Sequence, residues 1–155
     1  MISIALIHPM LVHFPIVFLV SAVVLDLIVL ITKQDFGGRQ GLPLIAAVTL
    51  LLGTLSAVVA AIFGDMASDK AIAAGFSAAP IETHETFAII TICIFGLYSL
   101  WRLLVLWRGY SLRGFIAWVS AIPGMIGLVL LITTAYYGGE LVYHFGVNVA
   151  PVIAK

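Results

Sequence analysis

Four long apolar runs limit what this sequence can fold into. A helix needs about 20 predominantly apolar residues to cross the hydrocarbon core of a bilayer. The runs predict membrane-spanning helices at about residues 11–32, 42–63, 84–106 and 115–137. With 63% hydrophobic and 9% charged residues, the chain lacks the charged surface of a soluble domain. We therefore predict a single all-α domain over residues 1–155, an integral membrane four-helix bundle.

The segment between the second and third runs is rich in Ala, Ser and Gly. Residues 66–80 are too short and too polar to span a bilayer, so we predict a surface loop or an interfacial helix there. The N-terminus has neither a basic region nor a small-residue cleavage motif, which indicates that the first run is retained.

The basic residues are distributed unevenly between the two sides of the predicted bundle. One side carries five: Lys33, Arg39, Arg102, Arg108 and Arg113. The other side carries two: Lys70 and Lys155. Because cytoplasmic loops are enriched in Lys and Arg, this asymmetry predicts that both termini are extracytoplasmic. The net charge of zero argues against a nucleic-acid partner.

All four histidines fall at the predicted extracytoplasmic end. His8 and His13 begin the first span, His84 begins the third, and His144 follows the fourth, while Asp65 ends the second. A polar side chain at the membrane interface is commonly a solvated helix cap. His13 lies inside an apolar run, where such residues usually face the bundle interior, so we expect His13 and His84 to be functional.

One carboxylate lies deep in the first span. Asp26 is more than three helical turns beyond His13. It could relay protons, or it could be neutral and hydrogen-bonded to a neighbouring hydroxyl such as Ser56 or Thr54. No second acid is expected at that depth, which favours the structural role.

A series of short motifs carries a resemblance to a known family. They are His8-Pro9-x-x-x-His13-Phe14-Pro15-Ile16, Gly64-Asp65, His84 and Gly138-Gly139-Glu140-Leu141-Val142-Tyr143. Over nearly the whole chain the sequence resembles the domain of unknown function 2231 family, small bacterial four-helix membrane proteins. The family is similar to di-haem membrane cytochromes and often accompanies c-type cytochromes or dehydrogenases. The resemblance implies electron transfer, a bacterial inner-membrane location, and roles for His8, His13, Asp65 and His84.

The C-terminal motif departs from the family pattern. The family places a histidine directly before the glycine, and Phe145 occupies that position here. His144 is one residue earlier, about 100° away around a helix, so it is the weakest ligand candidate.

The first functional hypothesis is a b-type haem protein. Haem iron takes axial imidazoles, and a four-helix bundle can hold the macrocycle between facing helices. We expect His13 and His84 to be the axial pair, with His8 and His144 serving a second haem or the propionates. The single cysteine excludes a CxxCH attachment motif, so any haem is noncovalent.

Electron-transfer partners follow from this hypothesis. The protein would exchange electrons with a quinone or a periplasmic cytochrome, or serve as a subunit or anchor of a dehydrogenase complex, and it could form an oligomer. Aromatic residues Tyr136, Tyr137 and Trp118 could line a quinone pocket, although interfacial or packing roles are more common for such residues. The chain is more typical of a complex subunit than of a stand-alone enzyme.

Two alternatives remain open. His8, His13, Asp65 and His84 could together bind a Zn, Cu or Fe ion, since three imidazoles and a carboxylate are ordinary ligands for these metals. Alternatively, the chain could be a structural subunit of a membrane complex whose histidines only cap helices.

Overall fold

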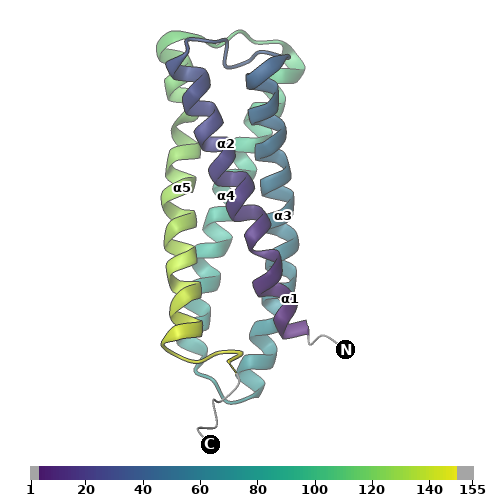
Figure 1. The fold of residues 1–155 in the computed structure, drawn as a ribbon, viewed down its shortest axis with the longest axis vertical. Coiled ribbons are helices and arrows are strands. Elements are labelled where there is room, and N and C mark those ends of the chain that lie inside the picture. The colour runs from purple at the N-terminus through teal and green to yellow at the C-terminus, as the bar shows by residue number, and fades with distance from the viewer. Residues whose placement is uncertain (1–3, 150–155) are drawn as a thin grey trace, which may run out of the picture.

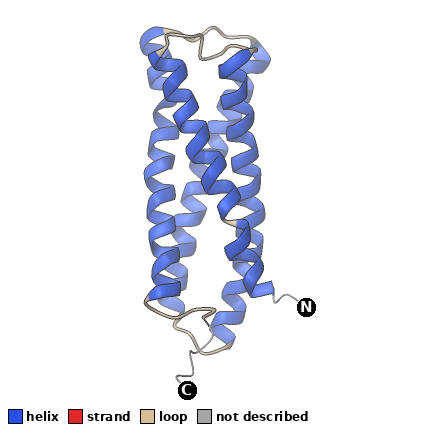
Figure 2. Cartoon of the chain, viewed as in Figure 1, coloured by secondary structure: helices blue, strands red, loops and turns tan. Residues whose placement is uncertain are grey.

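The computed structural model describes residues 4–149, which form an all-helical bundle (Figures 1 and 2). Its elements are α1 (Ile4–Leu11), α2 (His13–Ile31), α3 (Gly41–Ala73), α4 (Ala78–Arg108) and α5 (Gly114–Tyr143). Four helical segments are long and apolar enough to cross a membrane, the first combining α1 and α2 as Leu6–Ile31. The predicted all-α fold with four spans is confirmed.

The break between α1 and α2 has a local cause. Pro15 has no N–H, so it cannot form the usual helical hydrogen bond to the carbonyl of Leu11. The helix is interrupted only at Val12, whose N–H still bonds the His8 carbonyl at 3.1 Å. The two pieces therefore enter the bundle as one slightly irregular span.

Residues 66–80, predicted as a surface loop or an interfacial helix, are largely helical. Helix α3 continues to Ala73, a short turn follows, and α4 begins at Ala78. Alanine has the highest helix propensity, so this polar but Ala-rich stretch extends both helices. The extensions are held by a small apolar cluster of Ala71, Ile81 and Val147.

Small residues let the helices approach closely in the main core. A Cβ added at Gly53 of α3 would lie 2.7 Å from a methyl group of Leu19 on α2. One added at Gly127 of α5 would lie 2.8 Å from the Phe95 ring on α4. In a bilayer, where lipid tails are as apolar as the side chains, such close packing is a principal source of helix association.

The two ends of the bundle differ in their connections (Figure 1). One end carries the α2–α3 loop, residues 32–40, and the α4–α5 loop, residues 109–113; we call it the loop end. These loops bond each other, with the Phe36 N–H donating to the Leu112 carbonyl at 2.9 Å. The opposite end carries α1, the α3–α4 turn and the end of α5; we call it the histidine end.

Candidate functional site

Two histidines from different spans meet at the histidine end. His8 of α1 and His84 of α4 have ring centroids 6.3 Å apart, with the ring planes inclined by 77°. Both side chains are half-buried. The structure thus pairs His84 with His8, and not with His13 as the sequence predicted.

Each ring of the pair is held by a backbone carbonyl of a neighbouring helix, α3 for His8 and α5 for His84. Nδ1 of His8 lies 2.8 Å from the Ala60 carbonyl oxygen on α3, and Nδ1 of His84 lies 3.1 Å from that of Thr134 on α5. A carbonyl oxygen only accepts, so Nδ1 donates in both bonds. In the neutral imidazole, Nε2 then keeps its lone pair, the state in which histidine ligates a metal.

Two glycines make room for these rings. A Cβ at Gly64 would lie 3.0 Å from Cε1 of His8, and one at Gly138 would lie 3.1 Å from Cε1 of His84. Any larger residue at either position would force its histidine to move. The absence of a side chain at Gly64 and at Gly138 therefore gives the two histidine rings their space.

Polar and aromatic contacts surround His84. One turn into the bundle, the Phe87 and Tyr137 rings stack at a centroid distance of 5.1 Å. Thr91 and Thr134 share a hydroxyl hydrogen bond of 2.9 Å between α4 and α5. Oε1 of Glu85 is buried and has no hydrogen-bond partner among the described residues. The neighbourhood is therefore ordered on the bundle side and contains one unsatisfied carboxyl oxygen.

His13 does not occupy the interior position expected for it. Its side chain is exposed, and Nδ1 lies 3.4 Å from the Met10 carbonyl on the same span. The reason is helical geometry, because five residues at 100° each place His13 about 140° from His8 around the helix. When His8 faces the bundle, His13 must face away.

The other predicted ligands also lie at the surface. Asp65 on α3 is exposed, and so is His144, whose ring packs against Phe145 at a centroid distance of 4.8 Å. Within residues 4–149, no group of three or more His, Cys, Asp or Glu side chains is arranged to hold a metal ion. The structure brings together His8 and His84 of the predicted set, and leaves His13, Asp65 and His144 outside.

The aromatic residues considered for a quinone pocket do not converge. Trp118 and Tyr136 are both on α5, separated by 18 residues and hence by about 27 Å along the helix axis. Both are exposed, at 43% and 62%. Tyr137 instead packs inward against Phe87. Trp118 and Tyr136 thus lie near opposite ends of α5, as expected for aromatic residues at the two membrane interfaces.

A second polar cluster lies in the loop-end half of the bundle. Asp26 of α2 is only 2% exposed, and its Oδ2 accepts a 2.5 Å hydrogen bond from the Tyr98 hydroxyl of α4. Its Oδ1 lies 3.2 Å from Nη2 of Arg102, also on α4. The hydroxyl partner is therefore Tyr98 and neither of the two suggested, because Ser56 bonds the Gly53 carbonyl of its own helix and Thr54 bonds the Leu50 carbonyl and the Ser99 hydroxyl.

Arg102 is a buried cation with contacts to three segments. Besides Asp26, it donates to the Phe36 carbonyl at 2.8 Å and to the Pro43 carbonyl at 3.0 Å. Its guanidinium also stacks on the Phe36 ring, 3.8 Å from the centroid. Sequence reasoning assigned Arg102 to the charged loop side and missed it as a partner. A signal existed, since Asp26 lies five residues before the end of α2 at Ile31 and Arg102 lies six residues before the end of α4 at Arg108.

These features define a multi-pass integral membrane protein, with a paired-histidine site at one end of the bundle and a buried ion pair in the other half. The family profile described as "Predicted membrane protein (DUF2231)" matches residues 5–151, so the chain belongs to this family. Comparisons with curated proteins and with solved structures give no match.

Proposed function

We propose that this protein is a membrane electron-transfer protein that binds b-type haem through His8 and His84. The carrying observation is the juxtaposition of these two imidazoles, each held by an Nδ1 hydrogen bond to a carbonyl of a neighbouring helix. Metal-ligating histidines almost always donate their second ring nitrogen in this way, which fixes the ring and raises its basicity.

The number of donors supports haem over a non-haem ion. A zinc site ordinarily needs three or four protein ligands, whereas haem iron needs at most two, because the porphyrin supplies four nitrogens. The pair offers two imidazoles, and within residues 4–149 no third donor completes a metal-holding group. The residues present fit an axial ligand pair.

The separation of the rings also suits a shared metal atom. At about 2.0–2.1 Å for each metal–imidazole bond, two coordinating nitrogens lie about 4 Å apart, and the ring centres roughly 2 Å farther. The observed 6.3 Å between centroids is in this range. The tight packing of each ring on Gly64 or Gly138 limits its movement and favours a preorganised site.

The location of the pair supports a particular place in an electron-transfer chain. When bound, haem supplies one-electron exchange. The distribution of basic residues favours an extracytoplasmic position for the histidine end. There the protein would exchange electrons with a quinone or an extracytoplasmic carrier, as a subunit or anchor of a larger redox complex in the bacterial inner membrane.

An optical spectrum of the purified protein tests the proposal. We expect a Soret band and sharp α-bands on reduction, lost in His8→Ala and in His84→Ala. His13→Ala and His144→Ala are the matched controls, since both side chains are exposed, and should keep the spectrum. Circular dichroism checks that every variant is folded.

Three outcomes would contradict the proposal. A colourless protein that carries stoichiometric Zn, Cu or Fe would favour the non-haem site. A protein with neither haem nor metal, after expression with haem supplied, would favour the structural-subunit hypothesis. Loss of the spectrum in His13→Ala with retention in His8→Ala would restore the ligand pair expected from the sequence.

A further inference from the structure

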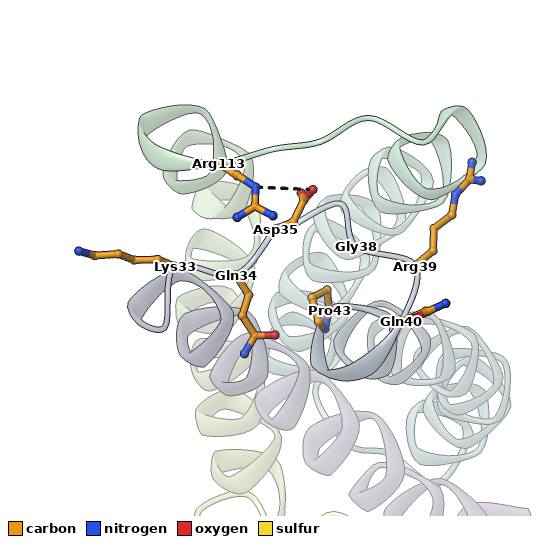
Figure 3. Close-up of a pocket in the computed structure, with 8 residues that line it drawn as sticks. All are labelled: Lys33, Gln34, Asp35, Gly38, Arg39, Gln40, Pro43 and Arg113. Atoms are coloured by element: carbon orange, nitrogen blue, oxygen red, sulfur yellow. Dashed lines mark ion pairs between the residues drawn. The ribbon is translucent and has the colours of Figure 1, made fainter.

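A polar hollow opens at the loop end, away from the paired histidines (Figure 3). It has a volume of about 560 Å³ and lies between the end of α2, the α2–α3 loop and the first turn of α3. Arg113, from the α4–α5 loop, closes one side. The hollow is shallow and widely open to its surroundings.

The hollow carries excess positive charge. Three cations line it, Lys33, Arg39 and Arg113, against the single carboxylate of Asp35. Figure 3 shows Arg113 directed at Asp35, with Lys33 and Arg39 at opposite margins. The net charge of +2 at this margin favours an anion.

The single carboxylate is already engaged by the protein. Its oxygens accept hydrogen bonds from Ser111 Oγ at 2.6 Å, the Leu112 N–H at 2.8 Å and the Gly37 N–H at 3.0 Å. Arg113 reaches it only with Nε, at 3.9 Å. Asp35 thus organises the two loops and compensates little of the surrounding positive charge.

The cations keep free donors. Lys33 forms no side-chain hydrogen bond or ion pair with the described residues, and the Nη groups of Arg113 form none either. Arg39 uses Nε and Nη2 to cap the Leu106 and Trp107 carbonyls at the end of α4, which leaves Nη1. Phosphate oxygens are the natural acceptors for such groups.

Exposed apolar side chains lie on α2 and α3 near the hollow. Ile31, two residues before Lys33, is 69% exposed, and Ile45, two residues after the lining Pro43, is 54% exposed. A ligand bound here would meet cations at one end and apolar helix faces at the other. We propose that the hollow binds the phosphate headgroup of an anionic phospholipid, whose acyl chains lie along α2 and α3. Basic pockets beside transmembrane helices are a recurring form of anionic lipid site.

Native mass spectrometry of the full chain in neutral detergent tests this site. Phosphatidylglycerol, phosphatidylcholine and inorganic phosphate would be titrated separately. We expect phosphatidylglycerol to bind in preference to the other two. The double variant Lys33→Gln/Arg113→Gln should weaken phosphatidylglycerol binding about 25-fold, at about fivefold for each cation near a membrane surface.

The matched control is Arg108→Gln, an exposed cation at the same end that stacks on Trp107 and does not line the hollow. It should keep the affinity within about twofold. Equal losses in the control and the double variant would mean that only general surface charge attracts the lipid, and would overturn the proposal. Equal binding of phosphatidylcholine, or equal binding of phosphate, would overturn it as well. Unchanged thermal unfolding without lipid verifies that the double variant is folded.

Discussion

The two halves of this bundle use buried polar groups in opposite ways. In the loop-end half, Asp26 accepts a hydrogen bond from Tyr98 and forms an ion pair with Arg102, and Arg102 further bonds two backbone carbonyls. At the histidine end, His8 and His84 each use one ring nitrogen on a carbonyl and keep the other available. Paired charges with several hydrogen bonds to neighbouring segments serve structure, whereas two imidazoles with an uncommitted ring nitrogen are suited to ligation.

The difference follows from the cost of burying charge. A buried ion must be paired and hydrogen-bonded, because an uncompensated charge in a low-dielectric interior costs several kcal/mol. A neutral imidazole carries no such cost, and one hydrogen bond is enough to orient it. Stability therefore requires the partners of the buried ions in the loop-end cluster. It does not require a second partner for each imidazole of the histidine pair, so these residues can serve ligand binding.

The largest predicted effect breaks the buried ion pair. Arg102→Met should destabilise the protein by about 3–5 kcal/mol, because Asp26 is left buried without its cation. Reversible unfolding of detergent-solubilised protein measures the loss. Adding Asp26→Leu should recover a substantial part, since no lone charge then remains. If the double variant is as unstable as the sum of the two singles, the pair is not coupled.

The second prediction compares glycines in the two halves. A Cβ at Gly124 would lie 2.8 Å from Cε1 of the buried Tyr98, so Gly124→Ala should cost about 1–3 kcal/mol through overpacking. Gly138→Ala meets the His84 ring at 3.1 Å and should mainly displace that ring, lowering haem occupancy with a smaller loss of stability. Unfolding and the Soret absorbance measure the two effects.

The control for this comparison is Gly96→Ala on α4, where an added Cβ meets no atom within 4 Å. It should be neutral or slightly stabilising, because alanine is a better helix former than glycine. A large loss for Gly96→Ala would mean that the glycine effects reflect the backbone, and not contacts with Tyr98 or His84.

A third prediction concerns the stability of the histidine end without cofactor. His84→Ala removes one hydrogen bond, to the Thr134 carbonyl, and should cost about 0.5–1.5 kcal/mol in the apo protein. The same unfolding assay used for Arg102→Met gives the value. A loss as large as that of Arg102→Met would indicate that the histidine pair is a structural network like the one in the other half.

The smallest predicted effect is a pH dependence at the loop end. Burial alone would raise the pKa of Asp35, but hydrogen bonds from Ser111, Leu112 and Gly37, together with the Arg113 charge, hold this pKa below its ordinary value of 3.8. A carboxyl group with a lowered folded-state pKa stabilises the protein above its unfolded-state pKa. That contribution is lost as the pH falls below 3.8 through the folded-state pKa.

Asp35→Asn should therefore reduce this acid-range change in stability, relative to the unaltered protein, while leaving the haem spectrum at neutral pH intact. Thermal unfolding measured at a series of acidic pH values provides the test. An unchanged pH profile in Asp35→Asn would show that other carboxyl groups dominate acid unfolding.

Much of the fold could be predicted from hydropathy, because the bilayer requires about 20 apolar residues for each helical crossing. The four spans and the grouping of His8 and His84 near one end followed directly. A helix over residues 66–73 followed only as one of two alternatives, since the polar residues favour a loop and the alanines favour a helix. The pairing of Asp26 with Arg102 did not follow either, because an arginine near the end of a span is usually solvated at the loop side.

The sequence by itself determined the class of the protein: four apolar spans, an asymmetric distribution of cations and histidines from three spans at one end. Only the tertiary structure decided which of these histidines contact each other. Hydropathy reports how deep a residue lies, whereas contact depends on rotation around each helix axis, at 100° per residue. That rotation, set by packing on Gly64 and Gly138, turns His8 toward His84 and leaves His13 outside.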